Sequence, residues 1–239
     1  MLAEGIKMWY VSRTIQRRNI MPGFIIHLAA AKLALKKLDG RINHNNFLVG
    51  NLAPDVFKEK TASHFRHPSR YGKRIEYPDL DMFLEKYAHL LSDSSCLGYY
   101  FHLYVDRCFF KDYFPGIVTF LDKDGNEESW KDAVVWAKVL KTGEIVPVMD
   151  FLSEKYYYGD FTLMNTYLVD RYDVPFDLDT NIENPGIEEV DYTLVGELLE
   201  RLDGWLGVSE EAIRDLKVFD IEDLTAFLEK IVEEWDYLR

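Results

Sequence analysis

The chain has 239 residues, 48% of them hydrophobic, which is enough apolar material for one large domain with a sizeable core. Its formal net charge of −13 argues against a protein that binds nucleic-acid duplexes. No apolar run reaches the roughly 18 residues of a transmembrane helix, and residues 1–20 lack the pattern of a secretory signal. The sequence therefore predicts a cytoplasmic protein without a transmembrane segment.

The charge is unevenly distributed along the chain. Residues 1–74 contain 14 Lys and Arg against 4 Asp and Glu, whereas residues 75–239 contain 14 against 37. An anionic ligand would prefer the first third of the chain. Chance drift of surface charge is an equally available explanation.

The first half of the chain has helical periodicity. Residues 1–20 differ in character from the segment MPGFIIHLAAAKLALKKL that follows, so we expect an N-terminal extension over 1–20 and a single domain over 21–239. Apolar residues at helical spacing predict helices over 24–38, 45–52, 79–91 and 97–113. The polar, basic segment 58–79 is predicted to be a loop.

The second half is also predicted to be mainly helical. Helices are expected over 130–140, 146–158, 161–172, 188–205 and 220–238, with Ser209 and Asp220 as plausible N-caps. Residues 117–129 suit either a short hairpin or a plain loop. No regular series of alternating strands is present. The sequence therefore predicts an all-α fold, a single multi-helix domain with a long connection over 173–187.

The two cysteines, Cys96 and Cys108, are 12 positions apart. On one helix this separation corresponds to about 18 Å, whereas a disulfide needs Cα atoms within about 7 Å. The spacing predicts free thiols, which are typical of a reducing compartment.

The segment GYYFHLYVDRCFF at 98–110 places an imidazole and a carboxylate four positions apart among apolar residues. On a helix His102 and Asp106 would lie on one face, one turn apart. A buried carboxylate needs a partner. The pair is therefore either a hydrogen-bonded pair inside the core or two ligands of a metal ion.

Further candidate ligands precede this segment, because all six histidines lie within residues 1–102. His27 is on an apolar helix face, next to small alanines that would leave room beside its ring. Asp55 follows Pro54 in a turn, and His64 lies in the basic segment ASHFRHP. Taken singly, each has a plainer explanation, as a core residue, a turn residue or a solvated loop residue.

Taken in order, His27, the segment GNLAPD ending at Asp55, the segment SHF with His64, and GYYFHLYVD resemble the zinc-dependent phospholipase C family. That family shares its helical fold with the fungal-type single-strand nucleases. The start MPGFIIH is similar to the cytoplasmic, uncharacterised branch of the family. The resemblance covers about residues 21–113.

The resemblance implies the roles of five residues. One zinc would be held by an Asp, two His and a second Asp, and the matching positions in this sequence are Asp55, His64, His102 and Asp106. A neighbouring zinc would take His27 and share Asp106. In the family it also takes the free N-terminal amine, which has no match with residues 1–20 attached. A third zinc in the family uses two downstream histidines and a glutamate, but no histidine follows His102. That site is therefore missing or rebuilt from carboxylates, for which Asp160 or Glu189 is conceivable.

The ligand set itself is mixed nitrogen and oxygen, which suits zinc and tolerates manganese or iron. One or two such ions activate water and neutralise phosphoryl oxygens, which suits hydrolysis of phosphoesters. By resemblance, Asp55 would also accept the proton of the attacking water and so be catalytic. Arg66 and Arg70, in a segment with six Lys and Arg against one Glu, are the candidate phosphate ligands, although a solvated loop explains them equally well.

We therefore expect a metal-dependent hydrolase, with zinc as the first choice of ion, acting on a small phosphoester or a phospholipid headgroup. Two alternatives stay open. One is a non-catalytic protein that retains the fold and a metal. The other is an interaction module, in which the acidic C-terminal half binds a partner and the histidines are core residues.

Overall fold

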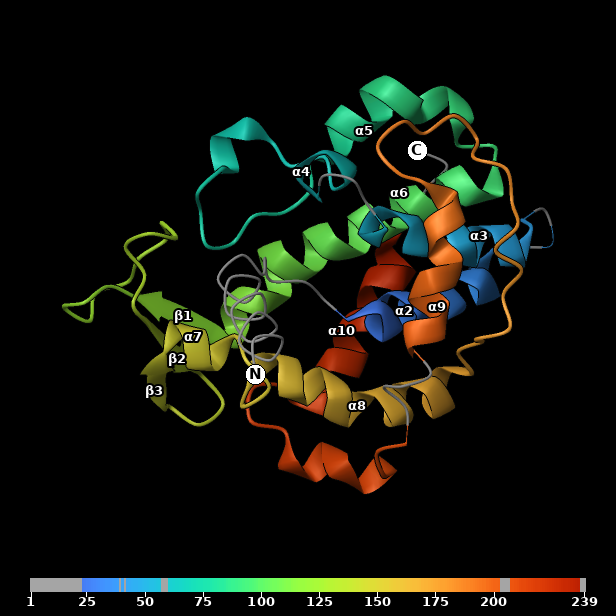
Figure 1. Cartoon of the computed structure of the whole chain (residues 1–239). Helices are drawn as coiled ribbons and strands as arrows, with labels where there is room; N and C mark the ends of the chain where they lie inside the picture. The colour runs from blue at the N-terminus through green and yellow to red at the C-terminus, as the bar shows by residue number, and fades with distance from the viewer. Residues whose placement is uncertain (1–22, 39, 41, 57–59, 203–206, 237–239) are drawn as a thin grey trace, which may run out of the picture.

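Helix α6 (Ser94–Cys108) runs through the middle of the molecule, and α2, α3 and α5 pack against it (Figure 1). The computed structural model describes residues 23–38, 40, 42–56, 60–202 and 207–236. The expected extension over 1–20 lies outside these residues. One cluster of buried apolar side chains extends from Ile25 to Trp235.

The first described helix, α2 (Phe24–Lys37), contains the candidate ligand His27 and matches the prediction for 24–38 closely. Its run of alanines packs without side-chain entropy cost, and the helix is buried on most of its surface. Helix α3 (His44–Leu52) follows, with the Asn43 side chain accepting a hydrogen bond from the backbone N–H of Asn46 at 3.1 Å.

Helices α3 and α6 approach each other closely through two glycines. A Cβ atom on Gly50 would overlap the backbone carbonyl of Ser95, and one on Gly98 would overlap the carbonyl oxygen of Phe47. Gly98, one turn before His102, therefore lets the backbones of the two helices touch, which no larger residue permits.

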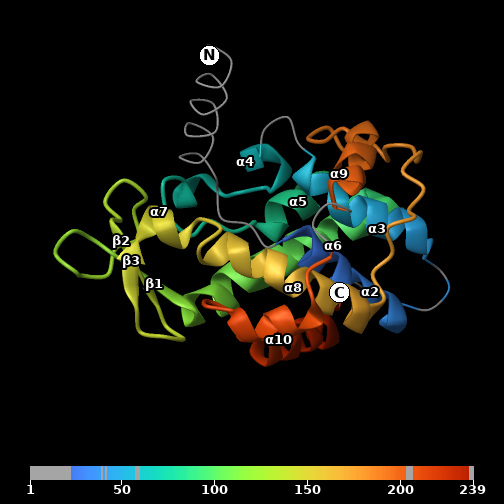
Figure 2. The ribbon, with the colours of Figure 1, turned by 60° about the horizontal axis from the view of Figure 1, so that its bottom comes forward.

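The remaining helical elements surround this pair. They are η1 (Ala53–Asp55), α4 (Lys60–Ser63), η2 (Pro68–Arg70), α5 (Leu80–Tyr87), η3 (Ala88–Leu90), the π-helical turn η4 (Phe109–Tyr113), η5 (Phe114–Gly116), α7 (Val148–Phe151), α8 (Tyr157–Tyr172), η6 (Tyr192–Leu194), α9 (Val195–Leu202), η8 (Glu210–Asp215) and α10 (Ile221–Glu234). Figure 2 shows α8 and α10 in the lower part of the helical body, where Arg171 of α8 contacts Glu229 of α10 at 3.1 Å. The predicted N-caps are confirmed, since Ser209 caps η8 and Asp220 caps α10.

The all-α prediction is wrong, because the chain also forms an antiparallel sheet of β1 (Val118–Leu121), β2 (Trp136–Val139) and β3 (Ile145–Pro147). The strand order is β1-β2-β3. In β1 and β2, Val118 pairs with Val139 and Leu121 with Trp136.

The sheet replaces a helix that we expected over 130–140. In β2 the buried residues Ala137 and Val139 alternate with the exposed residues Trp136 and Lys138, which is the two-residue period of a half-buried strand. A short apolar run of this kind does not distinguish helix from strand by periodicity alone.

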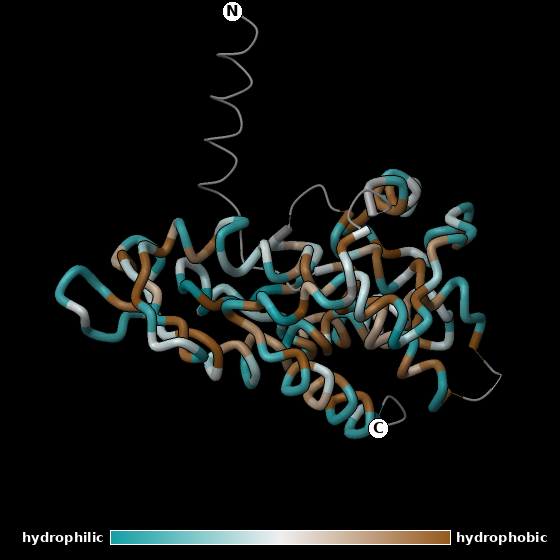
Figure 3. The backbone as a smooth tube through the Cα atoms, turned by 90° about the horizontal axis from the view of Figure 1, so that it is seen from below, coloured by the Kyte–Doolittle hydropathy of each residue, from teal (hydrophilic) through white to brown (hydrophobic). Residues whose placement is uncertain are grey.

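The predicted helix over 146–158 is also wrong, because the chain forms β3, a single turn (α7) and a separate bend before α8. The alternative that we left open at 117–129 is resolved as a hairpin-like turn after β1, in which Asp122 accepts hydrogen bonds from the backbone N–H groups of Asp124 and Asn126. This polar turn projects at the far left of Figure 3, away from the apolar helical body.

Two expectations from composition can be compared with the fold. Cys96 and Cys108 are free thiols, as predicted. In the described part of the chain, no helix combines the length and the apolar character that crossing a bilayer requires.

The contact between α3 and α6 predicts the effect of enlarging Gly98. Gly98→Ala should lower the free energy of unfolding by at least about 1–3 kcal/mol, because a methyl group would be forced into the carbonyl of Phe47 and the helices would have to separate. Urea unfolding measures the change. The matched control is Gly116→Ala, where the new methyl group meets no atom within 4 Å. Equal stability of the two variants would contradict the packing argument.

Candidate metal centre

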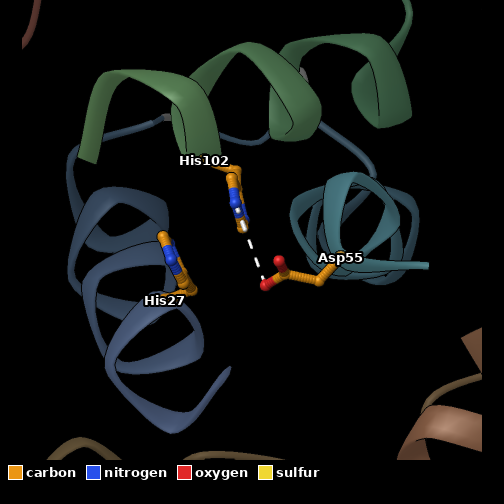
Figure 4. Close-up of side chains that lie close together, drawn as sticks. All are labelled: His27, Asp55 and His102. Atoms are coloured by element: carbon orange, nitrogen blue, oxygen red, sulfur yellow. Dashed lines mark ion pairs between the residues drawn. The ribbon is translucent and has the colours of Figure 1, made fainter. Parts of the chain in front are cut away.

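The five predicted ligands come from four separate elements that meet beside α6. His27 lies in the first turns of α2, Asp55 ends η1, and His64 follows α4. His102 and Asp106 lie on one face of α6, as their spacing predicts. Figure 4 shows His27, Asp55 and His102 converging from three different helical segments.

The distances between these side chains are short. His27 Nε2 lies 3.3 Å from Asp106 Oδ1, and His64 Nε2 lies 3.3 Å from Asp55 Oδ1 and 3.7 Å from Asp106 Oδ2. His102 Nε2 lies 3.9 Å from an oxygen of each carboxylate. At most 3% of any of these side chains is exposed to solvent.

His102 is held in one tautomer by the backbone of α3. Its Nδ1 lies 2.8 Å from the carbonyl oxygen of Asn51, and a carbonyl only accepts, so Nδ1 carries the proton. Nε2 therefore presents a lone pair, and it has no hydrogen-bond partner. Burial, together with the neighbouring His27, lowers the pKa of His102 to about 3, so Nε2 stays unprotonated at neutral pH.

The carboxylate of Asp106 is ionised beside this ring. Burial alone would raise its pKa, but the contact with His27 and the nearby His102 and His64 outweigh burial and lower the pKa to about 2. The rings of His27 and His102 are stacked, with centroids 3.7 Å apart and planes 10° apart. The two stacked rings lie near different oxygens of Asp106, His27 near Oδ1 and His102 near Oδ2.

His64 is positioned by its neighbour. The Ser63 hydroxyl donates to the carbonyl of Pro54 at 2.9 Å and lies 2.9 Å from His64 Nδ1, so it is suited to accept a proton from that nitrogen. The Tyr99 hydroxyl donates to the carbonyl of Ser63 at 2.5 Å. Together these bonds direct His64 Nε2 towards Asp55 and Asp106.

This arrangement suits a cation. A lone pair of His102 faces oxygens of Asp55 and Asp106, and neither the imidazole nor the ionised Asp106 carboxyl supplies a proton to separate them. Buried carboxylates facing a lone pair repel one another unless positive charge lies between them. Two overlapping triads have their ligand atoms within 4.8 Å of one another: His27, Asp55 and His102, and His64, His102 and Asp106.

The donor chemistry then selects the kind of ion. Neutral imidazole nitrogens with carboxylate oxygens are the ligands of zinc, and they also bind manganese and iron. A divalent ion would compensate the two carboxylates. The residues present are therefore suitable for the metal that the sequence motifs imply.

The two predicted phosphate ligands are engaged with carboxylates. Arg66 is buried and contacts Glu76 at 2.9 Å, and Arg70 lies 3.6 Å from Asp79 and stacks on Tyr77. These pairings give both arginines a structural partner within the loop that carries them. Their predicted role in binding phosphate is not supported by any contact with the five ligands.

The two conceivable ligands of a third metal are also engaged elsewhere. Asp160 accepts hydrogen bonds from the backbone N–H groups of Lys217, Val218 and Phe219 at 2.8–3.1 Å. Glu189 contacts Lys86 and Tyr87 at 2.7 Å. Both carboxylates therefore hold distant segments of the chain together.

Sequence reasoning missed the groups that orient the ligands. The carbonyl of Asn51 carries no side-chain signal, because every residue has a carbonyl. Ser63, next to His64, and Tyr99, one turn before His102, were visible in the motifs SHF and GYYFH, but only their three-dimensional contacts reveal their role.

Comparison of the chain with protein-family models, with curated proteins and with solved structures finds no match. The relationship to the zinc-dependent phospholipase C family therefore stays a prediction from the sequence motifs.

The depressed pKa of His102 predicts that the metal-free protein loses stability on acidification. In the unfolded chain His102 binds a proton near pH 6.5, whereas in the folded protein it does so only near pH 3. The free energy of unfolding of the metal-free protein therefore falls as the pH falls through this window. Asp106 adds little above pH 5, because its pKa falls from 3.8 in the unfolded chain to about 2 in the folded protein and both values lie below this range. We expect a loss of about 2 kcal/mol between pH 7 and pH 5, measured by urea unfolding after chelation.

The control for this prediction is His102→Gln, which removes the titrating group. Its unfolding free energy should change less with pH than that of the wild type over the same range. Parallel pH profiles for the two proteins would contradict a buried, neutral His102.

The contacts of Asp160 predict a purely structural effect. Asp160→Asn should lower the free energy of unfolding by about 1–3 kcal/mol, because an amide group would direct N–H bonds at the backbone N–H groups of residues 217–219. Metal content should not change. Asp170→Asn, on an exposed position of the same helix, is the control and should leave both stability and metal content unaltered. Loss of metal from Asp160→Asn alone would contradict this assignment.

Proposed function

We propose that the protein binds a divalent metal ion, zinc by its ligand chemistry, and uses it to hydrolyse phosphoesters. The observation that carries the proposal is the bare Nε2 of His102, which lies buried 3.9 Å from an oxygen of Asp55 and from an oxygen of Asp106 and carries no proton itself. The agreement of all five positions with the order of ligands in the zinc-dependent phospholipase C family supports the same reading.

The bound metal would supply activated water and positive charge for the phosphoryl oxygens. The chain's own residues would perform the other tasks. His27, His64 and His102 bind with neutral imidazoles, and Asn51 and Ser63 keep His102 and His64 in the tautomers that ligation needs. Asp55 is the proposed proton acceptor, because its carboxylate lies among the ligands and has two oxygens that can divide the tasks.

A small phosphoester or a phospholipid headgroup is the proposed substrate. Free Cys96 and Cys108 support a location in a reducing compartment such as the cytoplasm, where soluble phosphoesters are abundant.

A non-catalytic metal protein is the second candidate. The near-complete burial of all five side chains favours it, because structural metal sites are closed whereas catalytic ones keep an open position. The engagement of Asp160 and Glu189 with other parts of the chain also favours it, since neither of these two carboxylates is available to hold a third metal ion.

Metal analysis tests the proposal directly. Wild type purified without chelator or metal-affinity resin should contain one or two equivalents of zinc, manganese or iron by mass spectrometry, and His102→Gln should lose at least one equivalent because it removes a ligand shared by both triads. The loaded wild type should hydrolyse a soluble diester such as bis(p-nitrophenyl) phosphate.

The matched control is His89→Gln, which replaces an exposed histidine outside the cluster and should retain full metal content. A wild type that binds none of these metals after reconstitution, and whose thermal stability is unchanged by chelation, would overturn the proposal and leave the histidines as core residues of an interaction module. Tight metal binding without turnover of any phosphoester would favour the second candidate.

A further inference from the structure

The outer face of the antiparallel sheet is apolar. In β2, Trp136 and Lys138 are exposed and point away from the core, on the side opposite to the two buried residues of the strand. Cross-strand partners share a face, so Pro147 and Ile145 of β3, which pair with Trp136 and Lys138, lie on this face as well. A sheet with one solvated face normally has polar residues at such positions, whereas three of these four are apolar.

The exposed large apolar side chains are concentrated in and around this sheet. Trp136 is 36% exposed, Leu140 39% and Ile145 55%. Of the seven large hydrophobic side chains that are exposed in the described part of the chain, six lie within residues 130–149, and the other is Tyr71. Figures 1 and 2 show the sheet at one end of the molecule, beyond the helical body. An apolar patch of this kind indicates a surface that another segment or molecule covers.

The edges of the sheet are poorly suited to pairing with an added strand. The edge strand β3 is three residues long and ends in Pro147, which has no backbone N–H to donate. At the other edge, the carbonyl of Phe120 in β1 already accepts a hydrogen bond from the N–H of Glu128 at 2.9 Å. A covering segment would therefore be held by side-chain contacts with the outer face rather than by a backbone ladder.

The part of the chain that forms the sheet is acidic. Residues 117–149 contain six Asp and Glu against four Lys. Two of these lysines are used within the protein, because Lys131 contacts Glu76 at 2.8 Å and Lys141 donates to two backbone carbonyl groups before α10. The segment that complements this surface is therefore both apolar and positively charged.

The N-terminal extension over residues 1–20 has this chemistry. It contains four Lys and Arg against one Glu, so its formal charge is +3. Half of its residues are hydrophobic, and two of them are the adjacent aromatic residues Trp9 and Tyr10. Its charge is opposite to that of residues 117–149, and its apolar side chains match the outer face of the sheet.

The described part of the chain begins close to the sheet. A Cβ atom placed on Gly23 would lie 3.5 Å from the ring of Phe161 in α8. Five positions before Phe161, the Tyr156 hydroxyl donates to the carboxylate of Glu144 at 2.9 Å, and Glu144 directly precedes β3. An extended chain of 20 residues spans up to about 65 Å, whereas five residues of a helix such as α8 rise only about 8 Å. The extension is therefore long enough to reach the outer face.

We propose that residues 1–20 of this chain dock on the outer face of the sheet, with apolar side chains against Trp136, Leu140 and Ile145. Because the extension belongs to the same chain, its effective concentration at the face is high, and weak contacts suffice to hold it. A second copy of the protein is a poorer occupant, since two acidic surfaces and both copies of Lys138 would face each other. The inference is independent of the metal centre.

Limited digestion of the full-length protein by trypsin tests the docking, with cleavage after Arg13, Arg17 and Arg18 followed by mass spectrometry. Ile145→Lys adds a positive charge to the outer face and should accelerate this cleavage roughly 10-fold, because a docked segment is cut only when it opens. Trp9→Ser should have the same effect from the side of the extension. The combined variant should be accelerated by less than the product of the two single effects, because the two residues act on one contact.

The matched control is Tyr71→Lys, which adds the same charge at an exposed apolar residue outside the sheet and should leave the cleavage rate of the extension unchanged. Cleavage within residues 23–239 and the melting temperature show whether a variant remains folded. Leu140→Lys is a second variant on the same face, for use if Ile145→Lys is less stable than the wild type. Equal cleavage of the extension in the wild type and in a folded outer-face variant would overturn the inference.

Two further measurements distinguish other occupants of the face. Sedimentation velocity over a range of protein concentrations detects a second copy, and co-sedimentation with phosphatidylcholine vesicles detects a lipid surface. A dimer or a vesicle complex that Ile145→Lys abolishes, while cleavage of the extension stays the same, would overturn the inference in favour of that occupant. A monomeric wild type that does not sediment with vesicles, and whose extension is cut more slowly than that of Ile145→Lys, supports docking of residues 1–20.

Discussion

The close packing of α3 on α6 is the constraint on which the candidate site depends. Gly50 and Gly98 remove the side chains that would keep the two backbones apart, and the carbonyl of Asn51 thereby reaches His102. Asn51 lies in the last turn of α3, where carbonyl groups have no partner within the helix. The ring of His102 on α6 thus donates a hydrogen bond to a carbonyl group at the end of α3 that has no partner within its own helix. The same bond decides which ring nitrogen of His102 is bare.

The electrostatics of the site follow from that bond. Once Nδ1 of His102 carries the proton, Nε2 cannot donate to Asp55 or Asp106, and the two carboxyl groups face an imidazole that burial keeps neutral. A hydrogen-bonded core pair, the simpler explanation of the sequence, would use Nε2–H as a donor to a carboxylate. The bond to Asn51 removes that option. Tautomer, rather than proximity alone, is therefore what separates a metal centre from a buried ion pair.

Sequence patterns predicted the parts of this fold that depend on local periodicity. The helices that carry His27 and His102 have long, strongly apolar repeats, and a spacing of four determines that His102 and Asp106 share a face. The sheet was missed because β2 is only four residues long and its apolar residues suit both periods. The partners of Arg66 and Asp160 were missed for another reason. The sequence does not indicate which residue each of them contacts. For Asp160 the partners are backbone N–H groups 57–59 positions away.

The number of ions bound would decide between a structural and a catalytic centre. Five donors around a single ion satisfy the usual coordination of zinc and leave no place for water, which is the closed arrangement of a structural site. Divided between two ions, with Asp106 shared, the same donors leave each ion short of ligands and therefore open to water or substrate. Both triads include His102, but His27 and His64 approach different oxygens of Asp106. A carboxylate whose two oxygens are approached by different imidazoles is suited to bridge two ions, so Asp106 is the residue on which an open arrangement would depend.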